Sequence, residues 1–179
     1  AFSLDMYGDG KIAKDADEAS KLAGKFYQDR QLMRNRAAAG LEVLKSQDIT
    51  DTLKLGAIGF CFGGTTVLEL ARSGADVDAI VSFHGGLQTP HPEDATNIKG
   101  SVLVNHGADD PYVKTEEVLG FQDEMRQGNV DWQMNIYGDA VHSFTNPAAG
   151  SDKSSGAAYN EKAAERSWKA MQVFFREIL

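Results

Sequence analysis

The chain has 179 residues, 42% of them hydrophobic and 25% charged, which is typical of one globular domain, and we expect a single domain over 1–179. A net charge of -8 makes nucleic acids and anionic membrane surfaces poor partners. The single cysteine excludes an intrachain disulfide, and neither a membrane-length apolar segment nor a signal peptide is recognisable, so the expected location is cytoplasmic.

The first part of the chain predicts a short strand, a loop and two helices. Ala1–Asp5 has the composition of the last half of a strand, and Met6–Lys14 is a loop rich in glycine and aspartate. Asp15, with Glu18 three residues later, predicts the start of a helix. Apolar residues at helical spacing then predict two helices that meet near 28–30.

The most informative stretch is an apolar segment that ends in a cysteine between glycines. Leu55–Gly59 predicts a buried strand, Cys61 the tip of a tight turn, and Thr65–Arg72 the helix that follows. The sequence GFCFG at 59–63 matches the G-x-nucleophile-x-G turn, in which larger residues at the two glycines would collide with the neighbouring backbone. At such a turn the start of the helix favours a thiolate, and the N–H of Phe62 is placed to bind an oxyanion. The alternative is a small buried core cysteine.

Three further segments complete the predicted sheet. Val77–Phe83, Ser101–Asn105 and Trp132–Tyr137 are apolar strands separated by helices or long loops. Such strands indicate a mostly parallel sheet with helices on both faces, the α/β class. Thr115 is expected to cap a helix that continues to Gln127.

The last part of the chain predicts a long loop and a final helix. The loop 138–159 is longer than most connections in compact domains, which favours a functional role. A helix is expected to begin after Asn160 and to bury one apolar stripe. The residues expected in that stripe are Ala164, Trp168, Met171, Phe175 and Ile178.

Residues that follow the strands are the candidates for chemistry, because ligands of open parallel sheets bind beyond the carboxyl ends of the strands. Cys61 follows one strand, Asp109 and Asp110 follow another, and His142 follows a third. The order of nucleophile, acid and histidine is that of α/β-hydrolases. A histidine accepts the thiol proton and a carboxylate holds the imidazole. The Gly-x-x-Asp-x-x-Val arrangement at 107–113 favours Asp110 over Asp109, although either residue also suits an ordinary turn.

Other signals are weaker. His84 and His106 follow strands, and a hydrogen-bonded structural role is favoured for each over a place in a pocket. Cys61 and the four histidines show no spacing typical of zinc sites, so no metal site is predicted. The glycines around Cys61 match neither a phosphate-binding loop nor a dinucleotide-binding motif.

The segments IGFCFGG, SFHGG, HGADDPYV and HSF, in this order, resemble the dienelactone hydrolase family of α/β-hydrolases over essentially the whole chain. The resemblance implies an α/β-hydrolase-like fold and a catalytic triad of Cys61, Asp110 and His142. It also implies that a small-molecule ester or lactone is hydrolysed through an acyl-enzyme on Cys61, without a cofactor.

Two departures from the family pattern modify these expectations. Family members that act on dienelactone carry arginines for the substrate carboxylate in segments that resemble LDMYGDG and HSFTN, where this chain has Asp9 and Asn146. Uncharged esters or lactones are therefore the expected substrates, with His84 and Asn146 as candidate pocket residues. The chain also resembles an N-terminally truncated member that lacks the first strands of the family and the second oxyanion donor.

The missing strands would leave Leu55–Gly59 at the edge of the sheet, where its open backbone groups favour a homodimer or a partner chain that supplies the strands. They also motivate an alternative function, a catalytically silent remnant that acts as a binding or interaction module. A redox-sensing thiol protein is a further alternative, although the chain has no second cysteine to resolve an oxidised Cys61.

Overall fold

The computed structural model describes residues 1–179 and divides them into two compact units, Ala1–Thr52 and Leu53–Leu179. The expectation of a single domain over the chain stays a prediction. None of the helices combines the length and the apolar composition that crossing a membrane requires.

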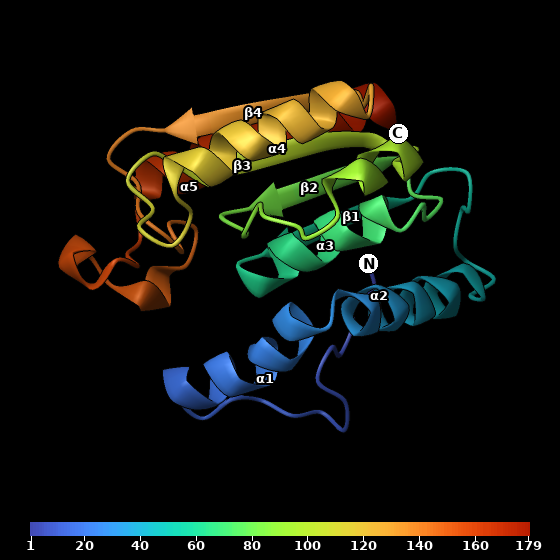
Figure 1. Cartoon of the computed structure of the whole chain (residues 1–179). Helices are drawn as coiled ribbons and strands as arrows, with labels where there is room; N and C mark the ends of the chain where they lie inside the picture. The colour runs from blue at the N-terminus through green and yellow to red at the C-terminus, as the bar shows by residue number, and fades with distance from the viewer. The chain divides into compact units, whose positions relative to one another are not determined.

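The first unit contains the helices α1 (Ala16–Gln28) and α2 (Arg30–Lys45) (Figure 1). Asp15 caps α1 by accepting a hydrogen bond from the N–H of Glu18 at 2.8 Å. Asp29 separates the two helices and caps α2 in the same way. The two predicted helices, their junction and the capping residue of the first helix are thereby confirmed.

The strand predicted at Ala1–Asp5 is wrong, because these residues have no regular secondary structure. The carboxylate of Asp5 accepts hydrogen bonds from the N–H groups of Tyr7, Gly8 and Gly10, which closes the chain into a turn. These backbone bonds also lower the pKa of Asp5. The side chain of Asp5 thus takes up the backbone donors of the residues that follow it, and no strand of the sheet pairs with this segment.

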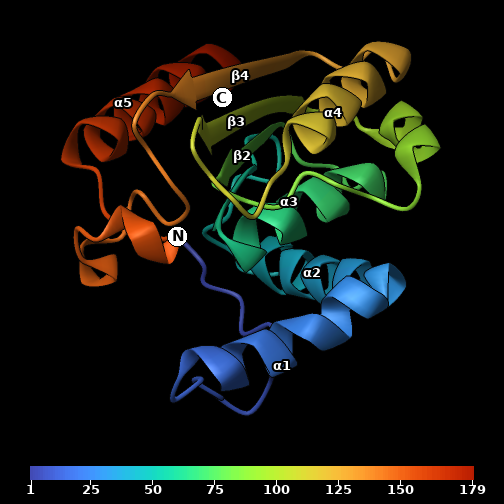
Figure 2. The same cartoon turned by 60° about the vertical axis from the view of Figure 1, so that its left-hand side comes forward.

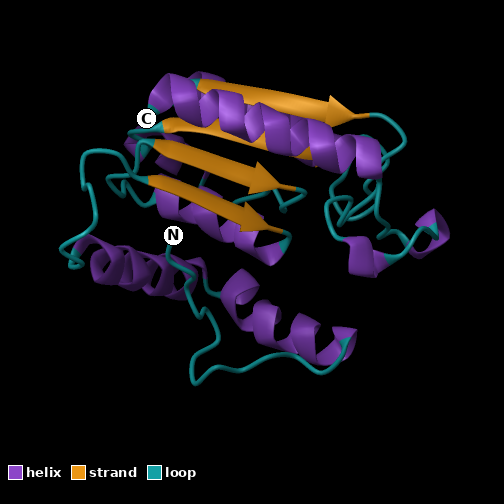
Figure 3. Ribbon diagram, turned by 180° about the vertical axis from the view of Figure 1, so that it is seen from behind, coloured by secondary structure: helices purple, strands orange, loops and turns teal.

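The second unit contains a sheet of four parallel strands in the order β1-β2-β3-β4 (Figure 3). The strands are β1 (Gly56–Phe60), β2 (Ala79–Phe83), β3 (Ser101–Gly107) and β4 (Trp132–Tyr137). All four predicted strands are confirmed, with ends that differ by two residues or fewer. Their carboxyl ends lie at one edge of the sheet, so the residues that follow them meet there.

Helices cover both faces of this sheet, as the sequence predicts. The helices α3 (Phe62–Arg72) and α4 (Thr115–Gln127) lie on one face, and α5 (Glu161–Ile178) lies on the other (Figures 1 and 2). Short 3-10 helices occur at Pro92–Asn97, Pro147–Ala149 and Lys153–Ser155. The core between β2, β3 and α5 is formed by Ala79, Val81, Phe83, Leu103, Met171 and Phe174.

The burial predicted for the first strand is confirmed at Leu55 and Gly59 but is wrong between them, since Gly59 is the one buried residue of β1 itself. Within the sheet β1 pairs with β2 alone, so it is an edge strand, as expected, and Ile58 and Phe60 are more than 40% exposed. Pairing with a second chain at this edge stays a prediction.

The stripe predicted for the last helix is confirmed in part, since Met171 is buried and Phe175 and Ile178 pack against the core. In the first half of the helix the buried residues lie one position earlier than predicted. Trp168 is 46% exposed, whereas Ser167 is fully buried. The hydroxyl of Ser167 donates to the carbonyl of Ala164 at 2.9 Å, so a small polar residue meets the core without an unpaired group. The buried residues of α5 are Ala163, Ser167, Met171 and Phe174.

Candidate active site

Cys61 occupies the turn between β1 and α3, where the sequence places it. Its φ of 49° and ψ of -118° lie in a region that residues with a side chain rarely adopt. The helix begins at Phe62, three residues earlier than the predicted Thr65, because Gly63 and Gly64 are already helical. Cys61 is therefore the residue that immediately precedes the helix, and the N–H of Phe62 belongs to the first turn, whose donors a helix does not use itself.

The crowding expected around the two glycines is confirmed at one of them. A side chain at Gly59 would overlap the carbonyl of Gly63 in the following helix. A side chain at Gly63 would meet nothing within 4 Å, so the expectation is wrong there. The second crowded position is Gly64, where a Cβ would lie 2.6 Å from the hydroxyl oxygen of Ser82 in β2. Gly59 and Gly64 thus permit α3 to approach the sheet closely.

The thiol of Cys61 lies within reach of two histidines and a serine. Its Sγ is 3.4 Å from Nδ1 of His84 and 3.2 Å from Oγ of Ser143. Sγ and one ring nitrogen each of His84 and His142 all lie within 4.8 Å of one another. Burial opposes the charged form, but hydrogen bonds with His142, His84 and Ser143 outweigh it and lower the pKa of Cys61 to about 5. The sulfur is therefore set up to be a thiolate.

His142 is held by a buried carboxylate. Its Nδ1 lies 2.9 Å from Oδ2 of Asp110, whose other oxygen accepts a hydrogen bond from the N–H of Tyr112 at 2.9 Å. Burial lowers the pKa of His142, but the hydrogen bonds to Asp110 and Cys61 prevail and raise it to about 9. The structure brings Asp110 against His142, whereas Asp109 is exposed. With Nδ1 engaged by Asp110, Nε2 is the nitrogen that His142 offers to Cys61.

The sequence leaves two roles open for His84, a hydrogen-bonded structural role and a place in the pocket, and the structure has features of both. It is 1% exposed, and its Nε2 lies 2.7 Å from Oγ1 of Thr145. Its other ring nitrogen faces Cys61. The φ angles of His84 (39°), Cys61 (49°) and Ser143 (57°) are all positive, which is unfavourable for residues with a side chain. Cys61 and the two residues that contact its sulfur therefore all have an unfavourable backbone conformation. Such strain persists where the surroundings fix the residue, and it concentrates at functional sites.

Sequence reasoning did not find Ser143 and Thr145, although both lie in the segment HSFT that contains His142. The available signal was their position one and three residues after His142, a predicted catalytic residue. Asn146, a predicted pocket residue, is exposed, and its side chain accepts a hydrogen bond from the N–H of Ala148 at 3.0 Å. This contact caps the short helix Pro147–Ala149.

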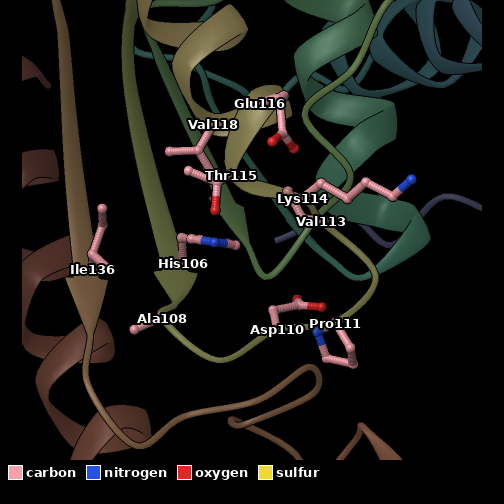
Figure 4. A pocket seen from close by; sticks show the side chains of 10 residues that line it. All are labelled: His106, Ala108, Asp110, Pro111, Val113, Lys114, Thr115, Glu116, Val118 and Ile136. Carbon is pink, nitrogen blue, oxygen red and sulfur yellow. The ribbon is translucent and has the colours of Figure 1, made fainter.

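A pocket of about 460 Å³ lies beside Asp110, between the end of β3 and the first turn of α4 (Figure 4). His106 lines it, and Asp110, Val113 and Thr115 lie around the same space. His106 is 4% exposed, and this burial lowers its pKa. Of the two histidines whose roles the sequence left open, His84 contacts Cys61 and His106 lines this pocket.

Comparisons with known proteins agree with this architecture. The family model described as the dienelactone hydrolase family matches residues 1–179. An uncharacterised protein of Caenorhabditis elegans is 40% identical over 148 residues, which cover 81% of this chain and 93% of the relative.

Two solved structures superpose over nearly the whole chain. A structure named m3DLH is 47% identical with a TM-score of 0.92, and covers 98% of this chain and 73% of its own. A dienelactone hydrolase-like promiscuous phosphotriesterase from metagenomic libraries is 49% identical with a TM-score of 0.89, and covers 97% of this chain and 72% of its own.

Proposed function

The chain belongs to the dienelactone hydrolase family, and from this membership we propose that it hydrolyses carboxylic esters or lactones with Cys61 as the nucleophile. His142 is the acid and base of the reaction, and Asp110 is the carboxylate that holds it. The observation that supports this assignment is the chain of contacts from Sγ of Cys61 through the ring of His142 to Oδ2 of Asp110. The three side chains come from three separate strand ends.

In the first half of the reaction the thiolate of Cys61 attacks the carbonyl carbon of the substrate. The oxyanion that forms is stabilised by the N–H of Phe62 and by the positive end of α3. The imidazolium of His142 then donates its Nε2 proton to the leaving alkoxide, and the acyl group remains on sulfur as a thioester. Asp110 stabilises the imidazolium and fixes the tautomer with a proton on Nδ1.

In the second half, water replaces the alcohol. Neutral His142 removes a proton from the water through Nε2, and the resulting hydroxide attacks the thioester. Collapse of the second tetrahedral intermediate releases the carboxylic acid and restores the thiolate. In a lactone the leaving alkoxide and the acyl group belong to one molecule, so both leave together after this step.

Neutral phosphotriesters are a second candidate substrate class. The observation that favours them is the 49% identity to a protein described as a promiscuous phosphotriesterase. The same residues serve this chemistry, because Cys61 attacks phosphorus in place of carbon and His142 protonates the alkoxide that leaves. A neutral triester, like a neutral ester, needs no cation to bind.

The experiment that tests the proposal is intact-mass analysis during turnover of p-nitrophenyl acetate. We expect an acetyl group on Cys61 at short times, release of p-nitrophenol, and return to the unmodified mass when the substrate is exhausted. The Cys61→Ala variant is expected to show neither acetylation nor turnover. A wild-type chain that reacts with iodoacetamide yet shows no acyl adduct and no turnover with a panel of esters, lactones and phosphotriesters would favour the silent binding module instead.

A further inference from the structure

Cys61, His84 and His142 form a cluster whose ligand atoms face one another. One sulfur and two imidazole nitrogens lie within 4.8 Å of each other, and they come from the ends of β1 and β2 and from the loop that follows β4. Hydrolysis uses Cys61 and His142, whereas His84 has no assigned step in it. Thiolate sulfur and imidazole nitrogen are the preferred protein ligands of Zn²⁺.

The spacing of these atoms is close to that of a tetrahedral zinc site. Zn–S bonds of about 2.3 Å and Zn–N bonds of about 2.1 Å at tetrahedral angles place sulfur and nitrogen about 3.6 Å apart. Sγ of Cys61 and Nδ1 of His84 are 3.4 Å apart. The ligand nitrogen of His142 lies within 4.8 Å of the other two atoms, so it has to move closer by up to about 1.2 Å to complete a face of the tetrahedron.

Each histidine of the cluster also has an oxygen partner on the nitrogen that faces away from sulfur. His142 is bonded through Nδ1 to the carboxylate of Asp110 at 2.9 Å. His84 lies with Nε2 at 2.7 Å from the hydroxyl of Thr145. Metal-binding histidines almost always hold such a partner, which orients the ring and fixes the position of the proton. The two supporting contacts of a zinc site are therefore already built.

We propose that Cys61, His84 and His142 bind one Zn²⁺ ion, with water as the fourth ligand, and that this ion reversibly inhibits the enzyme. The bound ion occupies the sulfur lone pair that attacks the substrate and the Nε2 of His142 that carries the proton. Cys61 and His142 are partly exposed, so an ion and its water reach them, while the buried His84 supplies a fixed third ligand. The sequence shows no zinc spacing because the three ligands meet only when the strand ends do.

Titration with Co²⁺ tests the site without reference to hydrolysis. Co²⁺ replaces Zn²⁺ in tetrahedral sites and gives intense visible bands, and a bound thiolate adds a near-ultraviolet charge-transfer band. We expect both signals to saturate at one Co²⁺ per chain and to disappear when Zn²⁺ is added. Blocking Cys61 with iodoacetamide in the otherwise unchanged chain should abolish the charge-transfer band.

Four variants test whether His84 and its partner Thr145 belong to the zinc site. His84→Ala should weaken Zn²⁺ binding about 100-fold or more, and Thr145→Val about tenfold, because loss of a supporting contact alone costs 10- to 100-fold. Thr145→Ser keeps the hydroxyl and should bind as the parent does. His91→Ala is the matched control, since His91 is exposed and pairs with Glu93 outside the cluster, and it should leave binding unchanged.

Direct measurement by calorimetry and circular dichroism of each variant completes the experiment. The proposal is overturned if Co²⁺ gives only the weak spectrum of a six-coordinate ion, if blocking Cys61 leaves the charge-transfer band in place, or if a folded His84→Ala variant binds Zn²⁺ as tightly as the parent. The inhibition rests on the proposed function, so a metal site in a chain that hydrolyses no ester would leave the zinc site standing while the proposed function and the inhibition both fail.

Discussion

The second unit contains two clusters of charged and polar side chains that differ in how completely they are satisfied. One surrounds Cys61 at the carboxyl ends of the strands. The other is centred on Arg72, which is fully buried on α3. Its guanidinium makes two hydrogen bonds to Glu124 of α4, at 2.7 and 2.8 Å, and one to Glu69 at 2.9 Å. A fourth bond reaches the carbonyl of Leu87 at 2.9 Å.

The difference between the clusters separates stability from reactivity. Every nitrogen of Arg72 has an acceptor, so this cluster joins α3 to α4 and has no open position for a reactant. Cys61 is a partly exposed residue, and its sulfur is hydrogen-bonded to groups that donate or accept protons. The Arg72 cluster therefore joins two helices of the scaffold, and the Cys61 cluster leaves one reactive residue incompletely enclosed. Substitutions in the Cys61 cluster should therefore change kcat, and substitutions in the Arg72 cluster should change the free energy of unfolding.

The largest expected effect is the loss of hydrolysis in Cys61→Ala. Removing a nucleophile that acts together with its partners costs about a million-fold in kcat. Alanine keeps the Cβ and therefore the same backbone strain at this turn, so the midpoint of thermal unfolding should stay within a few degrees of the parent. Cys61→Ser is the matched variant and should keep a small residual activity. An alanine variant that hydrolyses p-nitrophenyl acetate at the parental rate would refute the assignment.

The second largest effect is expected for Asp110→Asn. An amide in this place cannot hold His142 with its proton on Nδ1, and the equivalent change in serine proteases costs about ten-thousand-fold in kcat. Asp109→Asn is the control, since Asp109 is exposed beside it, and should have a mild effect. Steady-state kinetics of both variants decides between Asp110 and Asp109 as the acid. Equal losses of kcat would mean that the contact between Asp110 and His142 does not identify the acid.

Arg72→Met is expected to have the opposite effect to the Cys61 variants, with lower stability and unchanged kcat. This change leaves the carboxylates of Glu69 and Glu124 buried without their cation, which should lower the free energy of unfolding by about 3–5 kcal/mol. The kcat of the molecules that remain folded should be unchanged. Replacing all three residues by apolar ones of similar size should restore most of the lost stability. Urea unfolding and kcat, measured on the same samples, test the separation; a folded Arg72→Met variant with strongly reduced kcat would contradict it.

These two clusters also differ in how far the sequence reveals them. Local patterns mark Cys61, Asp110 and His142, because each follows a recognisable strand. The hydrogen bond between Glu124 and Arg72 spans 52 positions and depends on how α4 packs against α3, which no local pattern contains. The contact of His84 with Cys61 is likewise set by backbone angles at two strand ends. The fold class and the meeting of Cys61, Asp110 and His142 at one edge of the sheet were therefore predictable, whereas the contacts of Glu124 with Arg72 and of His84 with Cys61 were not.

The dependence on pH sharpens the distinction further, because the two titrating groups of the Cys61 cluster have pKa values on either side of neutrality. With the pKa of Cys61 near 5 and that of His142 near 9, the thiolate and imidazolium coexist between these values. Below about pH 5 the sulfur is protonated, and above about pH 9 His142 loses the proton that the leaving group needs. At pH 6 about 90% of the sulfur is thiolate, against less than about 1% for an ordinary cysteine.

We therefore expect kcat/KM to be nearly flat from about pH 6 to 8, and alkylation of Cys61 by iodoacetamide to reach half its maximum rate near pH 5. Both measurements are made with a chelator present. Asp110→Asn should narrow the flat region from its alkaline side, since the carboxylate helps to raise the pKa of His142. An alkylation midpoint near pH 8.5 in the parent protein would show that the sulfur is an ordinary thiol.

The smallest expected effect concerns the charge of the substrate. The hydrogen-bond partners of Cys61 are two histidines and a serine, and the guanidinium of Arg72 is fully engaged by carboxylates elsewhere. Asn146, in the segment where dienelactone-specific members of the family carry an arginine, caps a short helix and brings no positive charge. The imidazolium of His142 is already paired with Asp110, so a carboxylate on the substrate would lose its hydration without gaining an arginine in the Cys61 cluster. We expect kcat/KM for a lactone with a free carboxylate to be about tenfold lower than for its methyl ester, which corresponds to about 1.4 kcal/mol.

The difference in kcat/KM between the two substrates should shrink in Asn146→Arg, for which Asn146→Gln is the uncharged control. A parent enzyme that prefers the free carboxylate would mean that a cation reaches the substrate from a part of the chain outside the Cys61 cluster.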